Sequence, residues 1–473
     1  MPIAVLSARR PSRHLPQENR LDALFPGGRE AFDYNLPAKS GGGLWDAFFR
    51  RADKALHLLQ GAGHRLGLSL WRRAAIRQTL KWIIKHQEAD GAWGGIQPPW
   101  IYSLLALHIE GYTFDHPALA KGLGALNDPG WRVDEGEATF IQSTNSAVWD
   151  TMLTLAAFHD AELLEDFPNE VERAVQWLLA RQVRVQGDWS VKLPHVKPGG
   201  WCFEYANNFY PDTDDTAVAL IALAPFRKDP KWKAKGIEDA IQLGVNWLIG
   251  MQSRCGGWGA FDKDNNKTLL TKIAFCDYGE AIDPPSADNT AHIVEAFATL
   301  GIGRDHPSMV RALDYLKREQ EPGGAWFGRW GVNYIYGTWQ VACGLKTVGI
   351  DMNQPWMQKA GAWLRSVQKQ DGSFGESADT YEDPSVKGSG PSTASQTAWG
   401  TMALMAIYGP EDTGVLRGIR YLIDTQLPSG TWEEPWFTGT GFPRVFYLRY
   451  HLYRLYFPIM CLGRWLRESS SQW

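Results

Sequence analysis

The chain has 473 residues, enough for two or three domains or for one large barrel. Its net charge of −4, with both signs mixed, is not that of a polyanion-binding protein, so no nucleic acid partner is expected. The five cysteines form no CxxC pair, which indicates a reducing compartment without a disulfide framework. No apolar run is long enough for a membrane-spanning helix, and the first residues do not have the pattern of a signal peptide. The unusual feature is 23 Trp, with 16 Tyr and 20 Phe.

Residues 1–43 are rich in Pro, Arg and Gly, and predict an irregular arm or linker. Helical patterning begins at Leu44, and a repeat follows. In each copy an aromatic residue is followed five positions later by Gln and then, after a turn, by a second aromatic residue. The six copies are Trp82–Gln87–Trp93, Trp177–Gln182–Trp189, Trp247–Gln252–Trp258, Tyr315–Gln320–Trp326, Trp363–Gln368–Phe374 and Tyr421–Gln426–Trp432. We expect each copy to close a helix, with the Gln bridging backbone groups left open at the helix end.

A second kind of helix, more apolar and richer in small residues, lies between the copies. The predicted ranges are 146–158, 215–226, 290–300, 336–348, 396–408 and 448–462. Polar outer helices alternating with apolar inner ones predict an all-α fold, an α/α toroid (α6/α6 barrel) whose inner helices line a central cavity. Three inner helices begin on related signals, DDTA at 214–217, DNTA at 288–291 and SQTA at 395–398, so their N-termini should face the same end.

Three carboxylates, Asp212, Asp214 and Asp215, occupy four positions just before an apolar run. Carboxylates this close cannot all ionise independently, so at least one is expected to keep its proton. Near aromatic residues, such a proton suggests an acid that acts on an apolar substrate. The alternative is a helix N-cap, where Asp is favoured.

An α/α barrel with carboxylates on its inner helices suits three activities. A glycan hydrolase would use paired carboxylates in a polar cleft, and a protein prenyltransferase subunit would use zinc held by Asp, Cys and His. A terpene cyclase would use a single strong acid in an apolar, aromatic-lined cavity. Cys276–Asp277 is the only pair that suggests zinc, and no suitably placed His follows it, so no metal is expected. The aromatic residues among apolar inner helices favour the cyclase.

The segment PDTDDTA (211–217), preceded by PGGWCFEY, resembles the Asp-x-Asp-Asp-Thr-Ala motif of squalene–hopene cyclases, the bacterial class II triterpene cyclases. The Gln–Trp copies resemble the QW motifs of that family. Six further segments resemble the pocket segments of that family: residues 94–102, 148–151, 256–265, 275–292, 326–339 and 433–448. The resemblance implies an isomerase (an intramolecular transferase) that cyclises squalene to the pentacyclic hopanoids hopene and hopanol, without a metal or redox cofactor. Another polyprenoid stays open as the substrate.

The resemblance also implies roles for single residues. Asp214 would protonate a terminal alkene, with Asp212 and Asp215 keeping it protonated, and His292 would hydrogen-bond the acid, with Asp288 one turn earlier on the same helix. The implied cation-stabilising rings are Trp149, Phe203, Phe261, Trp330, Phe442, Phe446 and Tyr450. Gln97 and Tyr102 would act in termination, Tyr336 in proton return, and Phe275 and Cys276 at the narrow point of the substrate channel. For each aromatic residue the alternative is a packed core side chain.

The sequence departs from the family pattern at single positions. Phe261 replaces the usual Tyr, which bears on early-cation stabilisation and on the product distribution. Arg444 and Arg449 stand where small residues are usual, so their long side chains should point outward.

Family members are also longer at the N-terminus, with a second barrel interrupting the first. We therefore expect an arm at 1–43, part of a second barrel at 44–130 and the catalytic barrel at 131–473. The chain would then be a fragment, a naturally reduced form, or a protein whose Met1 is a misplaced start. The expected substrate is squalene. We expect a non-secreted protein that binds weakly, as a peripheral protein, to the cytoplasmic side of a membrane. A homodimer is also allowed. Weak or absent activity is expected, and the rival hypothesis is a truncated non-catalytic toroid that binds a partner chain.

Overall fold

The computed structural model describes residues 1–33, 43–65, 69–273 and 282–470. The chain forms two compact units, and each is considered by itself. Unit 1 contains residues 1–145 and 267–282, and unit 2 contains residues 146–266 and 283–473.

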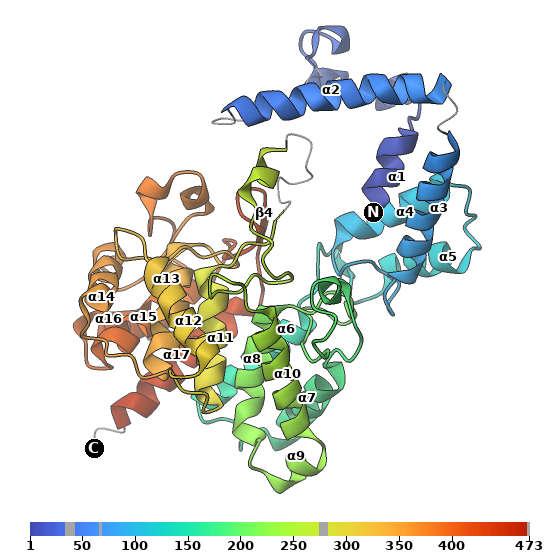
Figure 1. Cartoon of the computed structure of the whole chain (residues 1–473). Helices are drawn as coiled ribbons and strands as arrows, with labels where there is room; N and C mark the ends of the chain where they lie inside the picture. The colour runs from blue at the N-terminus through green and yellow to red at the C-terminus, as the bar shows by residue number, and fades with distance from the viewer. Residues whose placement is uncertain (34–42, 66–68, 274–281, 471–473) are drawn as a thin grey trace. The chain divides into compact units, whose positions relative to one another are not determined.

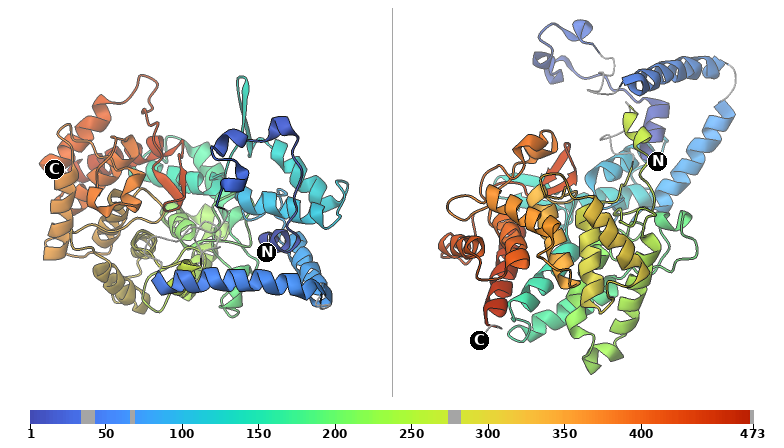
Figure 2. Two further views of the ribbon diagram at one scale, coloured as in Figure 1. Left: turned by 90° about the horizontal axis from the view of Figure 1, so that it is seen from above. Right: turned by 60° about the vertical axis from the view of Figure 1, so that its left-hand side comes forward.

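A closed ring of helices forms the centre of unit 2 (Figures 1 and 2). Among the described residues, the six inner helices are α6 (Ala147–Asp160), α8 (Thr213–Leu223), α11 (Ala287–Thr299), α13 (Tyr334–Thr347), α15 (Ala394–Tyr408) and α17 (Tyr453–Ser470). Each packs against the next, and α17 returns to α6. The helices packed outside this ring are α7 (Pro168–Arg181), α10 (Ile237–Met251), α12 (Pro307–Arg318), α14 (Pro355–Val367) and α16 (Thr413–Asp424), with the short α9 (Pro230–Ala234) beside α10. The predicted all-α fold and the α/α toroid are confirmed.

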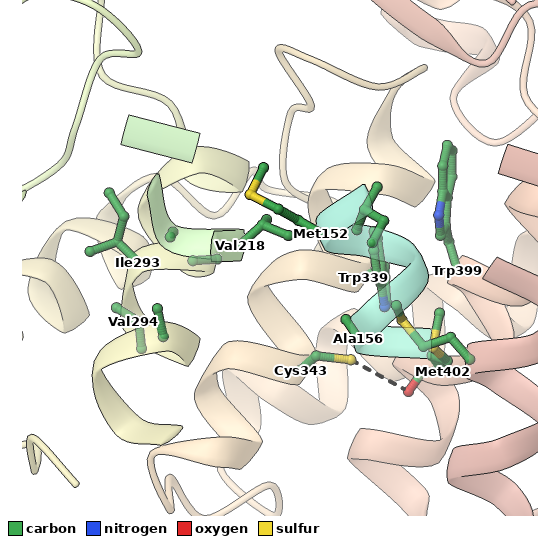
Figure 3. Close-up of a cluster of buried hydrophobic side chains, with 14 of the residues drawn as sticks. Met152, Ala156, Val218, Ile293, Val294, Trp339, Cys343, Trp399 and Met402 are labelled. Carbon is green, nitrogen blue, oxygen red and sulfur yellow. Dashed lines mark hydrogen bonds between the residues drawn. The ribbon is translucent and has the colours of Figure 1, made fainter. Parts of the chain in front are cut away.

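Burial explains why the two helix types differ in sequence. In α15 every residue from Ala394 to Ile407 is buried, so its sequence is apolar or small on all sides. In α16 the buried residues Val415, Ile419 and Leu422 recur at helical spacing and form a single apolar stripe. Figure 3 shows inner-helix side chains meeting in the core of unit 2, among them Met152, Ala156, Val218, Ile293, Val294, Trp339, Cys343, Trp399 and Met402.

The repeated Gln connects neighbouring outer helices. Gln252, after the end of α10, donates to the carbonyl oxygen of Gly256 (2.7 Å) in its own turn and to that of Ser308 (2.8 Å) in the first turn of α12. The same two kinds of bond are made by Gln87, Gln182, Gln320 and Gln368. Gln therefore bridges backbone groups as predicted, but the groups lie in the following turn and at the start of the next outer helix, not at the helix end, so the bridge joins one repeat to the next. Gly256 has φ +103° in this turn, a conformation that glycine adopts readily.

The repeated Trp closes the helix before it. The indole N–H of Trp258 donates to the carbonyl oxygen of Leu248, ten residues earlier, at 2.7 Å. In the second copy the predicted Trp189 is wrong, because Trp201 makes the corresponding bond to Leu178 at 2.8 Å. Residues 183–198 form an inserted segment between Gln182 and Gly199, and Trp189 packs elsewhere, 5.8 Å from the ring of Trp247.

A Thr near the start of an inner helix receives the next bond of the repeat. The backbone N–H of Trp258 donates to Thr290 Oγ1 at 3.1 Å. The equivalent bonds join Trp201 to Thr216, Trp326 to Thr338 and Phe374 to Thr397. The N-termini of neighbouring inner helices are also in contact, since Asn289 in α11 donates a hydrogen bond to Thr213 in α8 at 2.8 Å. The prediction that these N-termini lie at one end of the barrel is confirmed.

Unit 1 contains α1 (Pro2–Arg9), α2 (Gly43–Arg65), α3 (Ser69–Lys85), α4 (Gln97–Ile109), α5 (Pro117–Gly124) and a hairpin of β1 (Arg132–Glu135) and β2 (Ala138–Ile141). Residues 2–9 are helical where an irregular arm was expected, because Val5 is buried in a core with Ile83 and Trp100. The divisions at 43 and 130 stay predictions. Across the described residues, no helix has the length and apolar character needed to cross a membrane.

Candidate active site

The acidic motif begins an inner helix. Asp212 is the N-cap of α8, and its Oδ1 accepts the backbone N–H of Asp215 at 2.7 Å, which confirms the helix-cap alternative for this residue. Asp214 and Asp215 lie in the first turn and are buried. Burial raises the pKa of Asp212 to about 7, and burial together with the charges of Asp212 and Asp214 raises the pKa of Asp215 well above its usual range. The site therefore favours protonated carboxyls near neutral pH.

Asp214 is paired with His292 of α11. The imidazole Nδ1 lies 2.5 Å from Asp214 Oδ1, and the side chains of His292 and Asp214 are only 6% and 11% exposed. Burial alone would lower the pKa of His292, but the Asp214 charge and the hydrogen bond outweigh it, so that pKa is raised. The structure thus brings together the two residues that the resemblance placed at the centre of the chemistry.

Asp288 lies one turn before His292 but makes other contacts. Its carboxylate accepts the backbone N–H groups of Asn289 (2.9 Å), Arg329 (2.7 Å) and Trp330 (2.9 Å). Burial raises the pKa of Asp288. These bonds connect the start of α11 to the loop that carries Trp330.

Aromatic rings continue outward from His292. The ring of Trp149 on α6 is 6.3 Å from the imidazole, that of Phe203 is 6.3 Å from Trp149, and that of Tyr450 is 6.0 Å from Phe203. Three of the predicted rings therefore form one series that starts at the acid pair.

The other predicted rings of unit 2 form separate pairs. Phe261 and Trp330 meet edge to face at 6.0 Å, and the Arg329 guanidinium lies 4.5 Å from the centre of the Trp330 ring. Phe442 and Phe446 are 6.3 Å apart in the hairpin of β3 (Gly439–Phe442) and β4 (Phe446–Leu448).

Tyr336 is fully buried on α13, 4.9 Å from the ring of Trp399. Its pKa is raised well above the usual range, first by burial and then by the Asp214 charge, so the phenol keeps its proton within the field of the acid. Arg444 and Arg449 are exposed, and Arg444 Nε donates to the carbonyl oxygen of Tyr381 at 2.9 Å, as the outward orientation requires.

The remaining predicted residues lie elsewhere. Gln97 and Tyr102 are on α4 of unit 1, where Gln97 Nε2 donates to the carbonyl oxygens of Ile141 (2.9 Å) and Gln142 (2.8 Å). Phe275 and Cys276 lie outside the described residues. The predicted roles of these four residues stay predictions.

Several aromatic residues near the acid were missed. Trp339 lies 6.2 Å from His292 and stacks on Trp399 at 5.8 Å (Figure 3). Tyr453 accepts a hydrogen bond from the Trp149 indole at 3.2 Å. Helical spacing could have found Trp339, three residues after Tyr336.

Asp150 was also missed, although it follows Trp149 in the sequence. It accepts hydrogen bonds from Ser146 (2.6 Å) and from the Tyr456 hydroxyl (3.1 Å), and burial raises its pKa to about 6. Its position predicts a second titratable group close to the aromatic series.

A cavity of about 640 Å³ opens at the other end of the barrel, where the inner helices end. Its lining includes Asp160, Glu295, Cys343 and Arg464, and none of the predicted site residues. Asp160 and Glu295 both pair with Arg464, so the charged groups in this cavity mainly satisfy one another. We therefore place the candidate active site at the N-terminal end of the inner helices.

The ring of helices, with a buried carboxyl paired to His292 among aromatic rings, defines the class: an α/α-barrel protein with an acidic site beside apolar surface. The family model described as Squalene-hopene cyclase C-terminal domain matches residues 145–467, and the one described as Squalene-hopene cyclase N-terminal domain matches residues 1–135.

Curated relatives agree. A squalene–hopene cyclase of Alicyclobacillus acidocaldarius is 45% identical over 467 residues, covering 98% of this chain and 71% of the relative. One from Bradyrhizobium diazoefficiens is 37% identical and covers 100% of this chain and 71% of the relative. Among solved structures, a type II terpene cyclase from Scytonema aligns with a TM-score of 0.47 at 19% identity, covering 74% of this chain and 95% of its own. The chain belongs to the squalene–hopene cyclase family, as its motifs indicated.

Proposed function

We propose that this protein is an isomerase that protonates squalene, or a similar polyprenoid, and cyclises it to a pentacyclic hopanoid. The observation that carries the proposal is the 2.5 Å contact between His292 Nδ1 and Asp214 Oδ1 in a buried, aromatic-lined site. The family assignment favours this enzyme over the non-catalytic toroid.

The first step is a proton transfer from Asp214. The carboxyl O–H bond breaks, the alkene π pair forms a C–H bond with that proton, and the neighbouring carbon becomes a carbocation. Alkenes are weak bases, so the carboxylate left behind must be stabilised. His292, whose pKa is raised, supplies a positive donor to that carboxylate. Protonated Asp212 and Asp215 add no negative charge beside it.

Ring closure then moves the positive charge along the folded chain, because each new C–C bond uses the π pair of the next alkene. The faces of Trp149, Phe203 and Tyr450 can stabilise this charge by about 0.5–2 kcal/mol each without trapping it as nucleophiles would. Loss of a proton to a base ends the reaction as an alkene and leaves the molecular formula unchanged, whereas addition of water gives an alcohol. We assign Tyr336 to proton return through water, and Gln97 and Tyr102 to termination, on the family resemblance.

The proposal includes a membrane surface on the cytoplasmic side, since squalene is apolar enough to partition into lipid. Helix α2 exposes Leu44, Trp45, Phe48 and Leu56, the kind of side chains that an interfacial helix buries in the headgroup region. A vesicle flotation experiment tests this association, and light scattering after gel filtration tests the homodimer.

Purified protein incubated with squalene in detergent, followed by mass spectrometry of the extracted lipids, tests the function. Long incubations are appropriate because the sequence predicts weak or absent turnover. Asp214→Asn keeps the shape of the side chain and removes the acid, so turnover should fall by at least about 100-fold. Asp424→Asn, at an exposed pair with Arg420 on α16, is the matched control and should leave turnover unchanged. Absence of cyclised products from the parent protein, or their persistence in Asp214→Asn, refutes the proposal.

A further inference from the structure

We infer that Asp283 is a positioning residue for the reaction: with Asp288 it forms a carboxylate pair that holds the loops of Phe261 and Trp330 so that their rings meet. The inference rests on the proposed function and deepens it, because it names the groups that fix the orientation of two cation-stabilising side chains.

The Asp283 carboxylate accepts hydrogen bonds from the backbone of the loop that carries Phe261. Its Oδ1 accepts the backbone N–H of Ala260 at 3.1 Å, and its Oδ2 accepts those of Phe261 and Asp262, both at 2.7 Å. Three consecutive N–H groups on one carboxylate leave this short segment one conformation in which all of them are satisfied.

Close packing supports the same reading. A Cβ added at Gly259 would lie 2.5 Å from the Asp283 carbonyl oxygen and 2.9 Å from its Oδ2, so only glycine lets the loop come this near. The backbone N–H of Asp283 donates in turn to the carbonyl oxygen of Asn265 at 2.9 Å. The loop is therefore closed around Asp283 from both sides.

Asp288 makes the corresponding contacts to the second loop, through the N–H groups of Arg329 (2.7 Å) and Trp330 (2.9 Å). The chain between the two carboxylates is itself fixed. Pro284 and Pro285 restrict its backbone, the Tyr315 hydroxyl donates to the Pro285 carbonyl oxygen at 2.8 Å, and Ser286 N–H donates to the Trp258 carbonyl oxygen at 3.1 Å.

The two aromatic side chains depend on this arrangement because both stand on loops. Phe261 and Trp330 meet at 6.0 Å with an interplanar angle of 80°, the edge-to-face geometry that aromatic pairs favour. If the Phe261 loop is released, the ring no longer keeps its place beside the developing charge, and the cation loses its proton before the next ring closes. The pair of carboxylates thus controls how far cyclisation proceeds.

The test compares product ratios. Asp283→Asn keeps the side-chain shape but turns one acceptor oxygen into an N–H₂ donor that faces backbone N–H groups. We expect the ratio of partly cyclised to pentacyclic product to rise about tenfold, the factor that corresponds to one lost hydrogen bond to a charged group. Phe261→Ala should raise the same ratio. The double variant should resemble Phe261→Ala, because both changes act through one ring.

Asp424→Asn is the control, at the exposed end of α16. It makes the same change of Asp to Asn at an ion pair with Arg420 in which both side chains are largely exposed. It should keep the parent product ratio. A lower total turnover in Asp283→Asn with an unchanged ratio, or additive effects in the double variant, overturns the inference.

A crystal structure of Asp283→Asn gives a check that does not depend on activity. We expect residues 259–262 to shift and the Phe261 ring to leave Trp330; an unmoved loop contradicts the inference. Failure of the parent protein to form any cyclised product would instead refute the proposed function, so the two failures can be told apart.

Discussion

Arg464 should be among the most sensitive positions of the barrel, because it joins the last inner helix to two others. Its Nε lies 2.6 Å from Asp160 Oδ2 on α6, and its Nη2 lies 3.5 Å from Glu295 Oε1 on α11. The side chains of Arg464, Asp160 and Glu295 are 16%, 9% and 11% exposed, so solvent screens these contacts little. Arg464→Met keeps much of the apolar stem and removes the charge.

The pKa of Asp160 gives a first measure of the effect. Burial alone would raise this pKa, but Arg464, with smaller contributions from His159 and Arg467, outweighs burial and lowers it to about 2 from 3.8. That shift corresponds to about 2.5 kcal/mol, at about 1.4 kcal/mol per pH unit. Arg464→Met leaves the buried Glu295 carboxylate without this cation, and leaves Asp160 with Arg467 alone at 3.1 Å. A total cost of about 3–5 kcal/mol is therefore expected. In a unit of roughly 300 residues this lowers the melting temperature by about 5–8 °C.

Thermal unfolding followed by circular dichroism or calorimetry measures the shift. Arg420→Met is the matched control, because Arg420 pairs with Asp424 on the exposed face of α16, and its cost should stay within about 0.5 kcal/mol. A carboxylate with a depressed folded pKa stabilises the fold above its ordinary pKa and loses that contribution as pH falls. The parent protein should therefore lose stability between about pH 4 and pH 2 through Asp160, and Arg464→Met should show less of this loss, because Arg467 still pairs with Asp160. Equal melting temperatures for the two variants would refute the reasoning.

Two further predictions concern the repeats and the acid. Gln368→Met leaves the Gly372 and Gly414 carbonyl oxygens without their donor and should cost about 1–3 kcal/mol in denaturant unfolding, whereas Gln426→Met, at an exposed copy, should cost less. An equal cost at both positions would show that the bridge between outer helices does not stabilise the barrel. The pKa of Asp212 is raised to about 7, so its proton is kept below that pH and lost above it. Turnover should therefore decline as pH rises through about 7. Asp212→Asn keeps a capping side chain and should remove this part of the profile, and an unchanged profile would assign the titration to another group.

The repeats made the fold predictable, because Gln and Trp act at constant distances from the helix that they close. The second copy was misassigned for the same reason: Trp189 stands near the expected distance from Gln182, and only the hydrogen bond from Trp201 to Leu178 shows where the helix is closed. The helix at residues 2–9 could not be predicted, since burial of Val5 in the core of unit 1 outweighs the local Pro- and Arg-rich signal.

The site was predictable where its residues share one motif. Asp212 and Asp214 are separated by one residue, and His292 could be placed by resemblance. Trp399 was missed because it comes from a different helix and meets Trp339 only when α15 packs against α13. The role of Asp288 was also incomplete, because its bonds to Arg329 and Trp330 depend on a loop 41 residues further along the chain.

Closure of the barrel through its first and last helices has a consequence for synthesis. Asp160 and Arg464 are 304 residues apart, so the ring stays open until α17 has left the ribosome. At about 5–20 residues per second, this takes about 15–60 s, during which helices that are apolar on every side lack their final neighbour. C-terminal truncations that remove α17 should accumulate as aggregates rather than as smaller folded proteins.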